Sequence, residues 1–331
     1  MSQKLITIVV PTFRRNEILA ASLPRLLEQV TDECEVIILD NASPVPVAQT
    51  IGSMIAGRAN VRVVRNRFNV GLSGNLMRAF EVCSTRWLWI LGDDDPPVPT
   101  AVAQVIARVK ENPEALLLNF STVHYRRPQD FQTRGLAAFV AELDNFSSAV
   151  FISTNIYNAE RMQPQLNIGV AYSYSTIPHF ALLVASLTET DVAMFFSQKI
   201  VDQNAFGSIE SWPMVTHYMG AMTVLELLPT SALQRKMAKL MLQTFPELRS
   251  LATQLVLSGE RTGDSARSLY VFRQSCYRMH YFGRRPAETL KAWAFSWAIR
   301  FPWVGARLAR LAYSMMRGSK LTPLQDVRSR L

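Results

Sequence analysis

The sequence has few cysteines and no long apolar run. Three cysteines, Cys34, Cys83 and Cys276, stand far apart among 331 residues and form no C-x-x-C pair. An odd number of widely spaced cysteines argues against a disulfide framework and a structural zinc site, and it favours a cytosolic protein with reduced thiols. No window supplies about 18 uncharged apolar residues, so the sequence predicts no membrane-spanning helix.

Glycine is missing from the segment that follows the first apolar run, which reads PTFRRNE at residues 11–17. An oxidoreductase that binds a dinucleotide would need G-x-G-x-x-G at this place. A sugar nucleotidyltransferase would need a glycine-rich, basic loop that holds phosphate, so the segment argues against both classes. The apolar run is short and stops at Pro11, so we expect a first strand and not a signal peptide.

Positive charge is concentrated in one part of the chain. The net charge is +9, and residues 284–331 contain ten basic residues against Glu288 and Asp326. The remaining residues are therefore nearly neutral. Hydrophobic residues make up 49% of the chain, which is enough for a sizeable core. The sequence predicts a folded body with a basic C-terminal tail.

Strand-like and helix-like patterns alternate up to about Trp212, which is typical of an α/β fold. Runs rich in β-branched and aromatic residues predict strands at 5–13, 34–40, 60–66, 86–91 and 115–121. After Trp212 the patterns indicate helices. We therefore predict an α/β domain over residues 1–215 and a helical region over residues 216–331.

Three consecutive carboxylates, Asp93, Asp94 and Asp95, follow RWLWILG at residues 86–92, most of which reads as a buried strand. Adjacent like charges repel each other and are costly near a core unless a cation neutralises them. Mg²⁺ or Mn²⁺ suits such oxygen ligands and commonly shares its remaining positions with substrate phosphates. In an extended segment Asp93 and Asp95 would point to one side and Asp94 to the other. A solvated loop that caps the helix near Thr100 is the alternative.

Polar residues also follow three other predicted strands. The first strand ends in PTF, the second in Asp40, and the third leads into NRFNVGLSGN at residues 66–75. Open α/β sheets bind ligands at the carboxyl ends of their strands. The order and spacing of these segments over residues 4–215 resemble family 2 glycosyltransferases. Members of that family have the GT-A fold, a Rossmann-like, mixed and mostly parallel sheet flanked by helices, with a nucleotide-sugar site at this edge.

The resemblance implies roles for individual residues. Pro11 and Thr12 would line the nucleotide pocket, Asp40 would read the base, and the loop over 69–75 would lie under the nucleotide. Charge alone makes Arg14 and Arg67 candidate partners of the diphosphate. The set expected to bind the nucleotide sugar is Pro11, Thr12, Arg14, Asp40, Asn69, Gly71, Asn75, Asp93 and Asp94.

The three acids match the D-x-D signature of the family. The match implies that Asp93 contacts the ribose or the metal and that Asp95 ligates Mn²⁺ or Mg²⁺. Asp94 could instead take the role given to one of its two neighbours. Many family members have another residue where Gly92 stands, and their acids come one position earlier. A late histidine completes the metal or diphosphate site in some GT-A enzymes, which makes His217 a further candidate ligand.

The general base is less clearly marked. Inverting transfer needs a base near the attacking hydroxyl group. Many relatives supply an Asp or Glu at the start of a helix, often in a Glu-Asp pair that this chain lacks. His179 stands at that place, and the ordinary pKa of histidine suits proton acceptance; Glu210 is the second candidate. Ser153, Asn155 and Asn158, which we expect together at a strand end, could bind a sugar or be ordinary turn residues.

Residues 284–320 combine tryptophan and phenylalanine with arginine. This composition suits a helix that lies in the headgroup region of an anionic membrane. A helix packed on the catalytic domain and a dimer interface are the alternatives. We expect no nucleic-acid binding, because the nearly neutral body offers no extended basic groove.

The residues and the resemblance together predict a metal-dependent, inverting glycosyltransferase. It would transfer a sugar from a nucleotide sugar to a saccharide acceptor, expected to be lipid-linked, in bacterial surface-polysaccharide assembly (O-antigen, capsule or lipopolysaccharide). The enzyme would be cytoplasmic, peripheral on the inner face of the cell membrane, and could form a homo-oligomer. The alternatives are a non-catalytic, membrane-associated nucleotide-binding or scaffold protein and a sugar nucleotidyltransferase.

Overall fold

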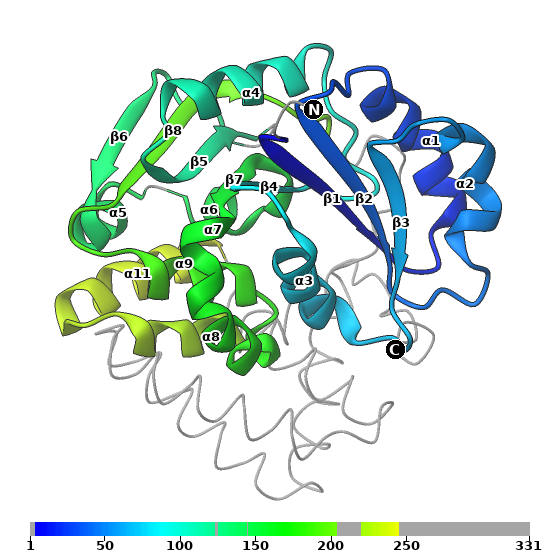
Figure 1. Ribbon diagram of the computed structural model, residues 1–331. Coiled ribbons are helices and arrows are strands. Elements are labelled where there is room, and N and C mark those ends of the chain that lie inside the picture. Colours follow the sequence, from blue (N-terminus) through cyan, green and yellow to red (C-terminus); the bar gives the residue numbers. More distant parts are fainter. Residues whose placement is uncertain (1–3, 123–124, 144, 204–219, 245–331) are drawn as a thin grey trace, which may run out of the picture. The chain divides into compact units, whose positions relative to one another are not determined.

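The computed structural model describes residues 4–122, 125–143, 145–203 and 220–244 (Figure 1). The chain divides into two compact units, Met1–Ile209 and Glu210–Leu331. The predicted domain boundary near residue 215 lies outside the described residues and stays a prediction. The basic tail at 284–320 also lies outside them.

A mostly parallel sheet of eight strands forms the centre of the first unit (Figure 1). The strands are β1 (Ile6–Thr12), β2 (Cys34–Asp40), β3 (Val61–Arg65), β4 (Trp87–Ile90), β5 (Ala115–Ser121), β6 (Phe131–Arg134), β7 (Asn155–Asn158) and β8 (Val192–Lys199). Their order is β3-β2-β1-β4-β7-β5-β8-β6. Of these strands, β7 and β6 run antiparallel to their neighbours. The parallel strands all end at one edge, called here the carboxyl edge; the opposite one is the amino edge.

Helices flank the sheet. They are α1 (Asn16–Leu27), α2 (Val47–Ile55), α3 (Gly71–Val82), α4 (Ala101–Glu111), α5 (Gly135–Glu142), α6 (Phe146–Val150), α7 (Ala159–Met162), α8 (Leu166–Ala171) and α9 (Pro178–Ser186), with the 3₁₀ turns η1 (Ile152–Thr154), η2 (Gln163–Gln165) and η3 (Ser173–Ser175). The predicted α/β class, with a mixed and mostly parallel sheet between helices, is confirmed.

The core explains why β1 and β4 lie side by side. Ile8 of β1 and Trp89 of β4 point to the same face of the sheet and share one buried cluster with Leu23 of α1, Ile51 of α2 and Val105 of α4. Burying a large aliphatic side chain contributes about 1.5–3 kcal/mol. The apolar side chains on this face of β1 therefore pack with those of α1, α2 and α4, while α3 contacts β1 and β4.

In the second unit the structure describes η4 (Met222–Leu227) and α11 (Ser231–Thr244), which contact each other. Buried Met222, Leu225 and Met237 give this pair of helices an apolar side. Both elements are helical, as the pattern after Trp212 predicts. Among the described residues, no helix has the length and hydropathy needed to cross a membrane.

Candidate active site

The carboxyl edge brings the end of β1 next to the three acids. In the parallel pair of β1 and β4, Val9 lies opposite Ile90. The Leu91 N–H continues this pairing and donates to the Val9 carbonyl at 2.9 Å. Thr12, at the end of β1, is therefore carried to the level of Asp93.

The three acids lie on a turn. The Asp95 N–H donates to the Gly92 carbonyl at 3.1 Å. Arg15 contacts Asp93 through Nη1 at 2.7 Å and Asp94 through Nη2 at 2.6 Å, whereas Asp95 contacts a different segment. The expectation that Asp93 and Asp95 share one side is wrong, because a turn breaks the two-residue alternation of a strand.

Asp93 is held by groups from β1 and α1. Thr12 Oγ1 donates to Asp93 Oδ2 at 2.7 Å, and Ser22 Oγ donates to the Asp93 carbonyl at 2.6 Å. Burial raises the pKa of Asp93 to about 7; Arg15 and Thr12 lower it, and the two neighbouring acids raise it. Burial therefore outweighs the contacts of Asp93 with Arg15 and Thr12. A further cation nearby would favour the ionised form.

Asp95 is 4% exposed and contacts the segment before β7. Ser153 Oγ, in η1, donates to Asp95 Oδ2 at 2.7 Å and accepts from the Gly92 N–H at 2.9 Å. A Cβ at position 92 would lie 2.7 Å from Asp95 Oδ2 and 3.2 Å from Ser153 Oγ. Glycine at position 92 therefore allows the Asp95 carboxylate to fold back over the turn.

Ser153, Asn155 and Asn158 do not lie together as expected. Ser153 and Asn155 are at the carboxyl edge, where β7 begins. Asn158 is at the other end of β7, at the amino edge, and its Nδ2 donates to the Ala115 carbonyl at 3.1 Å. The strand is short, but it crosses the sheet and separates these side chains.

Asp40 ends β2, and its carboxylate is fully buried. Its Oδ1 accepts from the Ser43 N–H at 2.8 Å, and its Oδ2 forms an ion pair with Arg65 of β3. Arg65 Nη2 also donates to the Ser43 carbonyl at 2.8 Å. Asp40 therefore shapes the loop after β2, and its contact with a nucleotide base stays a prediction.

A network of amide side chains orders the loop predicted to lie under the nucleotide. Asn66 Nδ2 donates to Asn75 Oδ1 at 2.8 Å and to Asn41 Oδ1 at 3.0 Å. Asn69 Oδ1 accepts from Asn41 Nδ2 at 2.8 Å and from the Gly71 N–H at 2.8 Å. Gly71 has a φ of +74°, which favours glycine. Asn41 and Asn66 were not among the predicted site residues, although Asn41 directly follows one predicted strand and Asn66 ends another.

The remaining predicted donor-site residues lie at the same edge. Pro11 is buried within β1. Arg14 and Arg67 are exposed, and their guanidinium groups lie 5.0 Å and 5.2 Å from the ring centroids of Phe13 and Phe68. Contact of the two arginines with a diphosphate stays a prediction.

Of the residues predicted for catalysis, the structure describes His179. Its imidazole is at the start of α9 and is 2% exposed. Nε2 lies 2.8 Å from the Val150 carbonyl of α6. A carbonyl oxygen only accepts hydrogen bonds, so Nε2 carries a proton. Glu210 and His217 lie outside the described residues, and the catalytic roles of His179 and Glu210 stay predictions.

The carboxylate groups of this turn are suitable ligands for a hard divalent cation. Asp93 and Asp95 offer buried carboxylate oxygens, and Arg15 contacts Asp93 and Asp94. Oxygen ligands of this kind suit Mg²⁺ and Mn²⁺. Within the described ranges, no group of three or more His, Cys, Asp or Glu side chains is arranged to hold a metal ion by itself.

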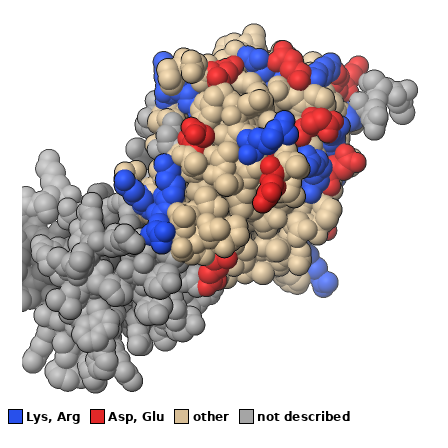
Figure 2. Space-filling view, turned by 90° about the vertical axis from the view of Figure 1, so that its left-hand side faces the viewer, with Lys and Arg blue, Asp and Glu red and all other residues tan. Residues whose placement is uncertain are grey.

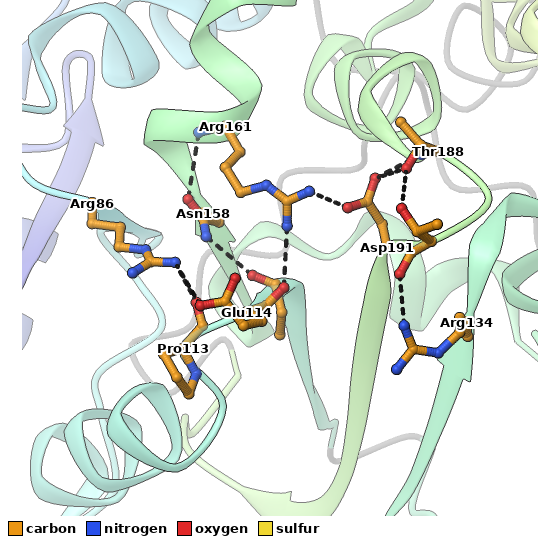
Figure 3. A network of polar contacts seen from close by, with 10 residues as sticks. Arg86, Pro113, Glu114, Arg134, Asn158, Arg161, Thr188 and Asp191 are labelled. Carbon is orange, nitrogen blue, oxygen red and sulfur yellow. Dashed lines mark hydrogen bonds and ion pairs between the residues drawn. The ribbon is translucent and has the colours of Figure 1, made fainter.

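A second polar network lies at the amino edge (Figure 3). Asp191 forms an ion pair with Arg161 and accepts from the Thr188 N–H at 2.7 Å. Arg161 Nη1 also donates to the Glu114 carbonyl at 3.1 Å. Burial alone would raise the pKa of Asp191, but the contacts from Thr188 and Arg161 outweigh it and lower the pKa. This network balances its charge internally and joins β5, β7 and β8.

The described surface has mixed charge. On the face that Figure 2 shows, basic and acidic side chains lie interspersed. Ion pairs such as Arg108 with Glu111 at 2.8 Å and Lys110 with Glu33 at 2.6 Å mix the signs. The described body therefore differs from the sequence at 284–331, where basic residues dominate.

Comparison with solved structures defines the class of fold. Residues 1–349 of TarS from S. aureus match with a TM-score of 0.62 and 13% identity, over 96% of this chain and 93% of that one. The structure of TarS residues 1–349 in complex with UDP-GlcNAc matches with a TM-score of 0.61 and 12% identity, over 94% of this chain and 92% of that one. A mannosyltransferase from Pyrobaculum calidifontis, in complex with GDP-Man and Mn²⁺, matches with a TM-score of 0.44 and 13% identity, over 96% of this chain and 87% of that one. The protein has a GT-A-like fold.

The family follows from the sequence. The family described as Glycosyl transferase family 2 matches residues 7–173, half of the chain. The chain belongs to glycosyl transferase family 2. An uncharacterized glycosyltransferase of Haemophilus influenzae is 29% identical over 111 residues, 33% of this chain, and the match spans 36% of that relative.

Proposed function

We propose that the protein transfers a sugar from a nucleotide sugar to a saccharide acceptor with inversion, using Mn²⁺ or Mg²⁺. The observation that carries the proposal is the turn of three consecutive acids at the carboxyl edge, where the buried side chains of Asp93 and Asp95 offer carboxylate oxygens. A nucleotide sugar brings a diphosphate to this edge, and a divalent cation joins its negative charge to that of the acids. Membership of family 2 supports the same reaction class.

The donor-site roles follow from position. Asp93 and Asp95 would hold the metal, with His217 as a further ligand, and the metal would stabilise the departing nucleoside diphosphate. Thr12 and Ser22 keep the Asp93 segment in place. Pro11, Asp40 and the loop over 66–75 would form the nucleotide pocket.

The base would come from the acceptor side. His179 is the first candidate, because it begins α9 at the place where many relatives carry an acid. Its Nε2 faces the Val150 carbonyl, so Nδ1 would accept the proton. Glu210 is the second candidate. Replacing His179 with Gln should cut turnover about 100-fold with little change in donor affinity if His179 is the base; equal turnover would pass the role to Glu210.

The acceptor would be lipid-linked, as in bacterial surface-polysaccharide assembly, and the protein would work on the cytoplasmic face of the cell membrane. The aromatic and basic residues of 284–320 support membrane association. Sedimentation with anionic liposomes tests this. Deletion from residue 284 onward should release the protein, and undiminished sedimentation would assign the tail to packing or to a homo-oligomer.

A thermal-shift screen tests the donor part of the proposal. UDP, GDP, dTDP and CMP and their sugar conjugates are each combined with Mn²⁺, Mg²⁺ or EDTA. A ligand at about 100 times its Kd stabilises the folded state by about 2.7 kcal/mol. We expect one nucleotide family to raise the melting temperature only with metal. Binding without sugar transfer to any saccharide acceptor would support the non-catalytic alternative.

A further inference from the structure

Arg127 is a buried cation without an acidic partner among the described residues. It follows β5 at the carboxyl edge and is 4% exposed. Its Nε and Nη1 atoms are buried, and neither has a hydrogen-bond partner in the part of the chain that the structure describes. By contrast, Arg15, Arg65 and Arg161 each pair with a carboxylate. The charge of Arg127 is thus not balanced within the described chain.

The position of the guanidinium group is nevertheless well defined. Nη2 donates to Asn119 Oδ1 and, at 3.2 Å, to Ser148 Oγ. The group lies 5.0 Å from the ring centroid of Phe195 and 5.6 Å from that of Tyr125. Neutral acceptors and aromatic rings therefore orient the cation, and two of its three nitrogens are left for another partner.

An unpaired buried charge destabilises a folded protein, because the charge loses its hydration without gaining a counter-ion. Burial lowers the pKa of Arg127 to about 10, which still leaves the guanidinium charged at neutral pH. Contact with aromatic rings offsets part of the cost. A cost of this kind is common where a site is preorganised for a ligand.

Arg127 is linked to the turn of three acids through the start of β7. Asn119, which accepts from Arg127, donates to Asn155 Oδ1 at 2.6 Å. Asn155 begins β7, directly after the 3₁₀ turn that carries Ser153, the partner of Asp95. On its other side Arg127 contacts α6, the helix whose last residue accepts from His179. Arg127 therefore lies beyond the donor site, on the side proposed for the acceptor.

We propose that Arg127 binds an anionic group of the acceptor, a phosphate or a carboxylate, which supplies the missing negative charge. Guanidinium groups bind both anions with charge-assisted hydrogen bonds. Tyr125 is half-buried and stacks on the guanidinium group, so the anion enters when this ring turns away. The assignment to the acceptor rests on the proposed function, whereas anion binding does not.

The test measures binding of simple anions. Wild-type protein, Arg127→Met and Arg126→Met are titrated by calorimetry with sodium phosphate and with sodium acetate, in EDTA and at constant ionic strength set with NaCl. Arg126 is the matched control, because it is adjacent and exposed. A third variant, Tyr125→Ala, removes the ring that covers the guanidinium group.

We expect saturable binding of phosphate or acetate by the wild type and by Arg126→Met. Arg127→Met should weaken this binding at least about tenfold, and its melting temperature in NaCl should be about 2–4 °C higher because an unpaired charge is gone. Tyr125→Ala should bind the anion more tightly. The preferred anion then identifies the acceptor group as a phosphate or a carboxylate.

Equal anion binding by the wild type and Arg127→Met would overturn the proposal, as would a lower melting temperature of Arg127→Met in NaCl. If Arg127→Met does not fold, Tyr125→Ala decides, and unchanged anion affinity in that variant overturns the proposal. The metal-dependent nucleotide response is measured on the same samples. Its absence from the wild type would contradict the proposed function while leaving the anion site of Arg127 in place.

Discussion

At the amino edge of the sheet Asp191 pairs with Arg161, whereas at the carboxyl edge the consecutive acids Asp93 and Asp94 share Arg15. Both edges belong to the same sheet, and both acids, Asp191 and Asp93, are buried. Yet their pKa values shift in opposite directions: that of Asp191 is lowered, and that of Asp93 is raised to about 7.

The difference lies first in burial, whose effect on the pKa outweighs the favourable contacts of Asp93 but not those of Asp191. Asp191 receives hydrogen bonds from Thr188 in addition to its ion pair. Asp93 also receives a hydroxyl donor and an arginine, but two further acids follow it in sequence. A network that serves stability can satisfy its charges by itself. We propose that the acids at the carboxyl edge instead bind a cation, and four changes to the two edges test this comparison.

Replacing Asp95 with Ala should have the largest effect. It removes a carboxylate proposed to ligate the metal, so metal-dependent nucleotide binding should fall at least about 100-fold. Titration calorimetry with Mn²⁺ and the nucleotide found in the screen measures the loss. Asp32→Ala, at an exposed acid, is the control. Unchanged affinity in Asp95→Ala would remove this residue from the site.

Replacing Gly92 with Ala should come second. The added Cβ would lie 2.7 Å from Asp95 Oδ2, so the carboxylate must move. A displacement of about 1 Å in a reacting geometry can cost about 100-fold in rate. We expect that loss in sugar transfer with an unchanged far-ultraviolet circular dichroism spectrum. Gly52→Ala, in the interior of α2, is a control because a Cβ there meets no neighbour within 4 Å. Full activity of Gly92→Ala would show that the position of Asp95 is not critical.

Replacing Asp191 with Asn acts on the other edge. The change leaves Arg161 without its charged partner, which should lower the free energy of unfolding by about 1–3 kcal/mol. Nucleotide affinity should stay unchanged, and urea unfolding with the nucleotide titration separates the two effects. A loss of nucleotide affinity without loss of stability would reverse the roles given to the two edges.

The same acid predicts a pH dependence. The pKa of Asp191 is lower in the folded state than its ordinary value of 3.8. Its stabilising contribution is therefore present above pH about 4 and is lost as the pH falls through the folded-state pKa. Acidification from about pH 5 to about pH 3 should cost the wild type more stability than Asp191→Asn. Parallel curves would mean that Asp191 does not contribute.

Replacing Ser153 with Ala should have the smallest effect. It removes one hydrogen bond to Asp95 and one acceptor for the Gly92 N–H. A bond to a charged group contributes about 1.5–3 kcal/mol at most, so we expect metal-dependent nucleotide binding to weaken by about tenfold. An effect larger than that of Asp95→Ala would place Ser153 in the site itself.

The sequence predicted the features that depend on local pattern. Apolar runs rich in β-branched and aromatic residues indicated β1, β2 and β4, and three acids after a buried strand indicated the carboxyl edge. The loop Asn69–Asn75 was expected from the family resemblance, and the structure places it at the same edge. These features can be predicted from the sequence because each depends on a few neighbouring residues.

Contacts between segments that are distant in the sequence could not be predicted. The hydrogen bond of Ser153 to Asp95 joins residues 58 positions apart, and the contact of Arg127 with Ser148 joins residues 21 positions apart. The turn at Gly92–Asp95 was also not predicted, because the run of acids was interpreted as an extended segment. Long-range packing decides such contacts.

The most direct test compares the two edges in one experiment: calorimetric titration of the screened nucleotide, with Mn²⁺ and with EDTA, into wild type, Asp95→Asn and Asp191→Asn. The account predicts metal-dependent binding by the wild type and by Asp191→Asn, even though the latter is less stable, and loss of binding by Asp95→Asn. Wild-type affinity in Asp95→Asn, or equal losses in both variants, would contradict it.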